Sequence, residues 1–272
     1  MQIGGKTALV LGAARGIGRQ IARALARRGS RLVLPYWDWP EDAAGMLREF
    51  SEMKIDFMAC RADLRKPDEV EALFEGIADR YAGLDILVNN IERGGMPIVH
   101  GAYTSEQWDL EMETTLKAKW WVVDHAMPLL KSAPEATIVV LSSIAGIVGR
   151  SGPAALIFND GYSAANRAVS SFTEIWARQG APTVRVNELM LGFFETRHAE
   201  KTRGWALLTD KEQREIVDQI LLKRTGSLDE IAGAVLFLIE EATYMTGSVL
   251  RMDGGFVLGA GRVPPLPGGI DL

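Results

Sequence analysis

Short apolar runs alternate with amphipathic helical stretches along almost the whole chain. In order, the runs read TALVL, RLVL, DFMAC, DILVNN, TIVVLSS, TVRVNELM and SVLRMDGG. They are nearly continuous in apolar residues, which is typical of strands buried on both faces of a parallel sheet. After the first run, Ile17, Ile21 and Leu25 recur every fourth residue, and this spacing predicts a helix over residues 16–28. Gly29 supplies its C-terminal stop.

Strands that alternate with helices predict an α/β fold, a doubly wound parallel sheet of the Rossmann type. Residues 1–256 hold no repeat and no linker-like change of composition, so we expect a single domain there. The polar, helix-forming residues 193–216 follow the sixth run, where a lid over a cleft would lie. Residues 257–272 are rich in Pro and Gly, so we expect this tail to fray or to pack on a neighbouring subunit.

Composition and charge exclude several classes of function. A net charge of −5 offers no basic footprint for nucleic acid. The single Cys60 cannot form an internal disulfide, and three scattered histidines show no metal-ligand spacing, so we expect no metal and a reducing cytoplasm. The N-terminus lacks a signal-peptide pattern, and no apolar run is long enough to span a bilayer, so we expect no membrane contact.

A glycine motif follows the first apolar run, where Gly12, Gly16 and Gly18 lie between a predicted strand and a predicted helix. Glycine permits the backbone angles of a tight turn and lets a pyrophosphate approach, while the helix N-terminus offers free amide donors. A lone motif would be consistent with an ordinary glycine-rich turn, but this context favours a nucleotide site. Neither GxSxG nor GxxxxGK[ST] occurs, so the hydrolase and P-loop classes lack their key residues.

Further motifs follow at ordered positions: ADL, LVNN, VVLSSIAG, GYSAAN, VRVNELMLGFFET and YMTGSVLRMDGG. In these motifs, and in the spacing Gly12-x-x-x-Gly16-x-Gly18, the chain resembles the short-chain dehydrogenase/reductase family, and in particular its 3-oxoacyl-carrier-protein reductases. The resemblance implies reversible hydride transfer between a nicotinamide and a small-molecule carbonyl or secondary alcohol. It also implies that Tyr162 is the acid or base, that Ser143 orients the substrate oxygen, and that the chain forms a homodimer or homotetramer.

The resemblance further implies the residues of a cofactor pocket. Asp63 and Leu64 would lie against the adenine, Asn89 near the adenosine ribose, and Thr196 at the nicotinamide carboxamide. The remaining implied contacts are Gly12, Arg15, Gly16, Ile17, Gly18 and Tyr36.

The choice between NADP and NAD depends on the end of the second run. NAD-using members of the family often carry an acidic residue at the position of Tyr36, which binds ribose hydroxyls and repels a 2′-phosphate. Its absence, together with Arg15 in the glycine loop, favours NADP. Trp37 stands where a second basic residue often helps, and Asp38 is near, so NAD stays open.

The chain departs from the family pattern at the catalytic end. A lysine one helical turn after the tyrosine usually supplies the charge that lowers the phenol pKa, but Asn166 stands there and brings no charge. Thr115 replaces the usual asparagine of the fourth helix, and Glu92 stands in NNIE where members usually read NNAG. The segment between Ser143 and Tyr162 is also longer than usual.

Two interpretations of these departures stay open. Ketoreductase domains of modular polyketide synthases carry YxxxN and place their lysine on the fourth helix. By that resemblance Lys119, one turn after Thr115 on the same face, would be the replacement, with Asn166 holding the ribose or positioning Tyr162. Lys117 points the other way, and both lysines are also consistent with a solvated surface. In the second interpretation, the fold binds a nucleotide but has lost or slowed the chemistry and acts in binding or regulation.

Overall fold

The computed structural model describes residues 1–92, 104–194, 205, 208–259 and 261. Within these residues, seven strands form one sheet in the order β3-β2-β1-β4-β5-β6-β7, and every neighbouring pair is parallel. Their bounds are β1 (Thr7–Val10), β2 (Arg31–Tyr36), β3 (Phe57–Arg61), β4 (Ile86–Asn89), β5 (Ala136–Ser143), β6 (Val184–Leu191) and β7 (Val249–Met252). The predicted doubly wound parallel sheet is confirmed.

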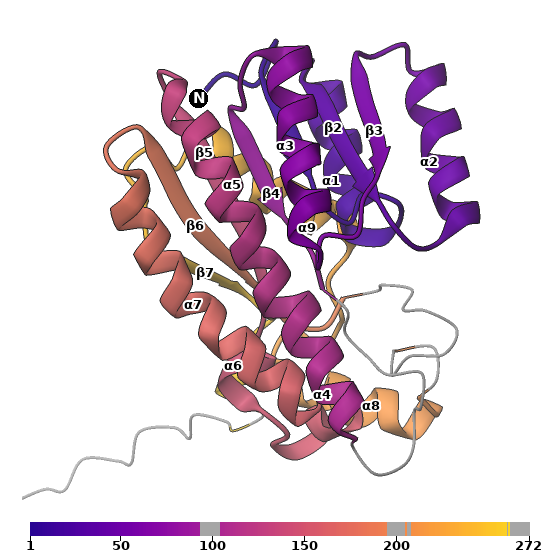
Figure 1. Cartoon of the computed structure of the whole chain (residues 1–272). Coiled ribbons are helices and arrows are strands. Elements are labelled where there is room, and N and C mark those ends of the chain that lie inside the picture. Colours follow the sequence, from indigo (N-terminus) through magenta and orange to yellow (C-terminus); the bar gives the residue numbers. More distant parts are fainter. Residues whose placement is uncertain (93–103, 195–204, 206–207, 260, 262–272) are drawn as a thin grey trace, which may run out of the picture.

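Helices cover both faces of the sheet (Figure 1). Each face has its own apolar core between the strands and the helices. One core receives residues from α1 (Gly16–Arg27), α2 (Pro40–Glu52) and α9 (Leu228–Glu240). The other receives residues from α3 (Pro67–Tyr81), α5 (Ala118–Ser132) and α7 (Asp160–Gly180). Along β5, Val139 and Leu141 face the first core while Ile138 and Val140 face the second. This two-sided burial explains why the run is apolar at consecutive positions.

The last strand does not follow that rule. β7 is one of the two edges of the described sheet, and its residues alternate between exposed and half-buried, with Val249 45% exposed. β3, the other edge, is half-buried to exposed along its length. The expectation that both faces of the β7 run are buried is therefore wrong, because only one neighbouring strand and part of one face cover it.

The fourth helical region changes its winding part-way. It begins with α4 (Ser105–Glu111), where Thr104 forms a capping box with Gln107, and continues as the π-helix η1 (Met112–Lys117) into α5. A π-helix closes i→i+5 bonds, so each turn takes up more residues than in an α-helix. Thr115 lies inside η1, fully buried, and its hydroxyl finds no hydrogen-bond partner.

A third apolar cluster lies past the carboxyl ends of β5 and β6 and joins short helices to the sheet. Its buried residues include Phe158, Phe193, Ile216 and Phe256. The elements there are α6 (Ala145–Val148), η2 (Gly152–Leu156), α8 (Asp210–Gln219) and η4 (Phe256–Leu258). In Figure 1, α4, α6 and α8 gather at this end of the molecule.

Some of the predicted features lie outside the described residues. Thr196 and most of the proposed lid, residues 195–204 and 206–207, are among them, as are residues 260 and 262–272 of the tail. In the part of the chain that is described, no helix is long and apolar enough to cross a membrane.

Candidate active site

Ser143 and Tyr162 are brought together by the end of β5 and the first turn of α7. Asn159 caps α7, its side chain accepting a 2.8 Å hydrogen bond from the Tyr162 amide. Asn166, one turn later and fully buried, joins both residues: its Oδ1 accepts from the Ser143 amide at 2.8 Å, and its Nδ2 donates to the Tyr162 carbonyl at 3.0 Å. Asn166 thus ties the strand end to the helix that carries the tyrosine.

Glu92, just past the end of β4, lies between Tyr162 and Lys119. The Tyr162 hydroxyl donates to Glu92 Oε2 at 2.8 Å, and Lys119 Nζ lies 3.2 Å from Glu92 Oε1. One carboxylate therefore bridges a phenol and an ammonium group. Sequence reasoning noted Glu92 only as a departure from the family pattern and gave it no role.

Lys119 is fully buried, which is rare for lysine unless it is paired. Besides Glu92, its Nζ donates to the Leu141 carbonyl on β5, while its own carbonyl accepts from Asn89 Nδ2 at 3.1 Å. Lys117 is exposed. The expectation that Lys119 faces inward and Lys117 outward is confirmed.

Burial raises the pKa of Tyr162 well above its usual value, and the nearby Glu92 carboxylate raises it further. A hydrogen bond with Ser143 lowers it, and Glu111 acts with Glu92 in raising it. The phenol is accordingly protonated at neutral pH. The Lys119 ammonium group contacts the Glu92 carboxylate, which in turn accepts the hydrogen bond of the phenol.

The glycine loop is packed against Asn90. A Cβ atom on Gly18 would lie 2.3 Å from the Gly12 carbonyl and 2.8 Å from Asn90 Nδ2, and one on Gly12 would lie 2.6 Å from the Asn90 carbonyl. A Cβ atom on Gly16 would meet no other atom within 4 Å, and the φ angle of Gly16 is +53°. Asn90 Nδ2 also donates to the Leu11 carbonyl at 3.3 Å, so Asn90, which sequence reasoning did not select, holds the loop in place.

The N-terminus of α1 is suited to a pyrophosphate. No side chain caps it and no acidic residue occupies its first turn, so its amides face the loop without a competing acceptor of their own helix. These features, with the open approach at Gly16, fit a dinucleotide cofactor. Of the other predicted contacts, Ile17 packs against the first core and Leu64 against the second, while the Asn89 side chain is fully buried.

Cations and aromatic rings surround the end of β2. The Arg15 guanidinium lies 4.5 Å from the Trp39 ring centroid and 3.7 Å from Asp42, and Arg61 lies 4.1 Å from the Trp37 ring centroid. The Lys66 ammonium group lies 5.3 Å from the centroid of the same Trp37 ring. Tyr36 itself is half-buried at the strand end.

Asp63 follows β3 and is held by its own neighbour. Its carboxylate accepts 2.8 Å and 2.7 Å bonds from the Arg65 guanidinium, which hold the pKa of Asp63 below its usual value. The Asp63 carboxylate is therefore ionised, and the Arg65 guanidinium offsets its negative charge where the adenosine of the cofactor is proposed to bind.

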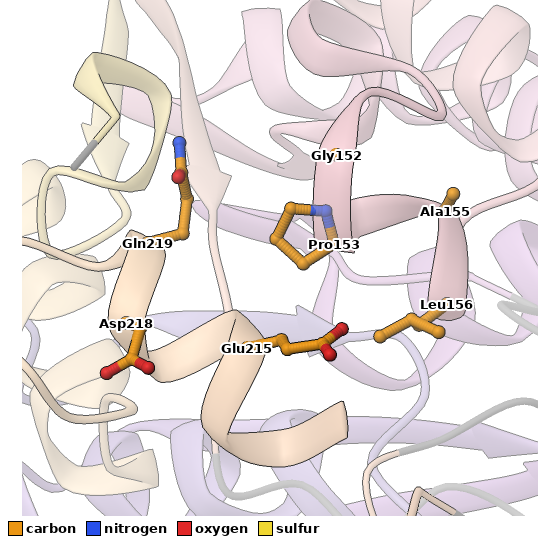
Figure 2. Close-up of a pocket in the computed structure, with 7 residues that line it drawn as sticks. All are labelled: Gly152, Pro153, Ala155, Leu156, Glu215, Asp218 and Gln219. Atoms are coloured by element: carbon orange, nitrogen blue, oxygen red, sulfur yellow. The ribbon is translucent and has the colours of Figure 1, made fainter. Parts of the chain in front are cut away.

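An open groove of about 500 Å³ lies between η2 and α8, at the edge of the third apolar cluster (Figure 2). Its lining residues are Gly152, Pro153, Ala155, Leu156, Glu215, Asp218 and Gln219. In Figure 2 the Glu215 side chain points toward Leu156, while that of Asp218 points away from Pro153. Neither Ser143 nor Tyr162 lines this groove, so it is separate from the catalytic candidates.

Comparison with known proteins identifies the family. Residues 12–257 match the family model described as Enoyl-(Acyl carrier protein) reductase. The chain belongs to the short-chain dehydrogenase/reductase family. It is 31% identical over 257 residues to the 3-oxoacyl-[acyl-carrier-protein] reductase FabG of Staphylococcus aureus, covering 93% of this chain and 98% of that protein. With the Vibrio cholerae protein of the same name it shares 32% over 262 residues, covering 95% and 100%.

A solved short-chain dehydrogenase/reductase supports the fold. A putative short-chain alcohol dehydrogenase from Sinorhizobium meliloti superposes with a TM-score of 0.79 at 27% identity, covering 94% of this chain and 98% of that one. The chain is thus a short-chain dehydrogenase/reductase over nearly its full length, and its family is one of nicotinamide-dependent oxidoreductases.

Proposed function

We propose that this chain is an NADP(H)-preferring oxidoreductase that acts on a carbonyl or secondary alcohol, with Tyr162 as the acid or base and Ser143 orienting the substrate oxygen. The observation that carries the proposal is the Tyr162 hydroxyl, held by a carboxylate beside a buried ammonium group and within the same cluster as Ser143. When bound, the cofactor supplies the hydride.

The protonated phenol is the form of Tyr162 that acts in carbonyl reduction. A protonated phenol is the form that can give a proton to the substrate oxygen, and the raised pKa of Tyr162 keeps it in that form at neutral pH. Asn166 orients both partners through its two hydrogen bonds, so we assign it positioning and not charge. As the proposed replacement for the missing lysine, Lys119 on α5 acts on Tyr162 through Glu92, which contacts both side chains.

The preference for NADP(H) is supported by the charges near β2. No carboxylate stands at Tyr36, while Arg15 and Arg61 lie near the same strand end, where a 2′-phosphate would gain from them. Asp63 opposes this attraction only weakly because Arg65 pairs with it.

We also propose a homo-oligomer in the cytoplasm. Apolar side chains are exposed on the helices and the strand through which the family commonly pairs: Trp120 on α5 and Ile175 on α7, at 37% and 43%, and Phe237 on α9 and Val249 on β7, at 40% and 45%. Exposed apolar groups at such positions favour burial between subunits.

The test begins with binding and proceeds to turnover. Fluorescence titration of NADPH and NADH measures cofactor preference, and a screen of ketones and 3-oxoacyl thioesters measures NADPH oxidation by the wild type and Tyr162→Phe. We expect tighter binding of NADPH and turnover that Tyr162→Phe abolishes. Loss of turnover in Lys119→Ala but not in the exposed control Lys117→Ala supports Lys119 as the replacement lysine.

Binding without turnover on every substrate would instead favour the second candidate, a nucleotide-binding homologue with impaired catalysis. The observation on its side is that Glu92 already neutralises Lys119 and raises the pKa of Tyr162.

A further inference from the structure

Glu92 occupies an uncommon position for a carboxylate in this site. It contacts the Tyr162 hydroxyl and the Lys119 ammonium with its two separate oxygens. Of this pair of charges, the Lys119 side chain is 0% exposed, whereas the Glu92 side chain is 23% exposed. Of these two charged groups, Glu92 is therefore the one that can exchange a proton between the phenol and solvent.

A free phenolate is costly at this site. Burial and the carboxylates of Glu92 and Glu111 all oppose the ionisation of Tyr162, and Asn166 supplies no charge. A phenolate beside the Glu92 carboxylate would place two anions at hydrogen-bond distance, with Lys119 as the adjacent cation. The phenolate is avoided if the phenol gives its proton to Glu92 at the same time as it accepts a proton from the substrate.

We propose that Glu92 is the proton relay group behind Tyr162, accepting the phenol proton during alcohol oxidation and returning it during carbonyl reduction; this rests on the proposed function. In oxidation, the substrate O–H bond breaks as its proton bonds to Tyr162 Oη. The Tyr162 O–H bond breaks as that proton bonds to Glu92 Oε2, and the substrate carbon loses its hydride to the oxidised nicotinamide. The alcohol is oxidised to a carbonyl, the nicotinamide is reduced, and Glu92 releases the proton to solvent.

Lys119 has a defined part in this relay. It holds Glu92 Oε1, which leaves Oε2 directed at the phenol, and the Leu141 carbonyl holds Lys119 in turn. A second buried carboxyl, Glu188 on β6, also interacts with Lys119, which lowers the pKa of Glu188 against the larger opposing effect of its burial. The ammonium group thus stays near acceptors when Glu92 is protonated.

The first test removes the proton-accepting ability of Glu92 without changing its size. We expect Glu92→Gln to lower kcat about 100-fold, in the range of general acid–base contributions, while NADPH binding by fluorescence stays within about twofold. Glu113→Gln, an exposed glutamate of η1, is the matched control and should keep wild-type turnover. Turnover in Glu92→Gln equal to or above that of the wild type overturns the relay.

A second variant separates proton transfer from packing. Formate in solution should restore part of the turnover of Glu92→Ala, because it can enter the vacated space and accept the phenol proton, and it should leave the activity of Tyr162→Phe unchanged. An Ala variant that stays folded by circular dichroism and is inactive at every formate concentration contradicts the relay.

A third measurement needs neither substrate nor cofactor. The ultraviolet titration of tyrosinate, taken as wild type minus Tyr162→Phe, reports the ionisation of Tyr162, which should move to lower pH in Glu92→Gln because an anion is removed. An unmoved titration overturns the Glu92–Tyr162 coupling. Turnover lost in Tyr162→Phe but kept in Glu92→Gln overturns the relay alone, whereas a wild type without turnover overturns the proposed function as well.

Discussion

At the scale of single residues, Asn166 replaces the charge of a lysine with two directed hydrogen bonds. Its Oδ1 satisfies the buried Ser143 amide and its Nδ2 reaches back one turn to Tyr162. We predict that Asn166→Ala lowers the free energy of unfolding by about 1–3 kcal/mol, because a buried amide is left without its acceptor. Urea unfolding measures the change. Arg167→Ala, its exposed neighbour, is the control, and an equal stability of the two variants would contradict the prediction.

Glu188 is the second residue with a distinct consequence. It is fully buried on β6, with Ser142 and Ser170 donating to Oε1 and no partner for Oε2. Burial raises its pKa, so the folded state holds its proton more tightly than the unfolded chain does. Its contribution to stability is therefore complete below the unfolded pKa and is lost as pH rises through the folded one.

We predict that Glu188→Gln, which is neutral at every pH, is more stable than the wild type and that its advantage grows as pH rises from the acid range toward neutral. Urea denaturation at a series of pH values measures this difference. The exposed Glu113→Gln should show no such trend. A constant difference across the series would mean that Glu188 keeps an ordinary pKa.

Among the residues of the site, local spacing predicted Lys119 but could not predict Glu92. The i, i+4 spacing of Thr115 and Lys119 sufficed to place Lys119 on the inner face, because helix periodicity is local. Glu92 meets its partners across 27 and 70 positions of sequence, and no local pattern carries such contacts. Asn90 was missed for the same reason, because its contact with the Leu11 carbonyl spans 79 positions of sequence.

At the scale of elements, the π-helix η1 sets the rotational position of α5 and hence of Lys119. Nothing in METTLK distinguishes it from an ordinary helical stretch, so its winding was not predicted. The apolar runs, by contrast, predicted all seven described strands. For the inner strands the reason is that burial on both faces leaves an apolar signal at consecutive residues, whereas the edge strands β3 and β7 are only partly buried.

We predict that inserting one alanine after Thr114 abolishes turnover, because one added residue rotates the following helix by about 100° relative to α4 and turns Lys119 away from Glu92. Steady-state NADPH oxidation measures the effect, and circular dichroism checks that the variant is folded. Thr114→Ala keeps the length of the helix and should retain activity, although it loses the hydroxyl bond to the Leu110 carbonyl. Full activity in the insertion variant would show that the helix adjusts its winding elsewhere.

At the scale of the whole molecule, exposed apolar side chains on α5 and α7 favour association of subunits. We predict that Trp120→Arg together with Ile175→Arg shifts the protein to smaller species in size-exclusion chromatography with light scattering, because two charges would be buried in the interface. Arginine at the exposed Glu174, beside Ile175, is the control for added charge. An unchanged mass in the double variant would move the interface away from these helices.

The open edge of β7 bears on how the protein behaves when dilute. In the described part of the chain no strand pairs with its outer side, so its backbone donors and acceptors form a template for any other strand. If subunit contacts normally shield this edge, dissociation and loss of soluble protein become linked processes. The useful lifetime of a stock solution would then shorten as its concentration falls, which is the reverse of ordinary aggregation.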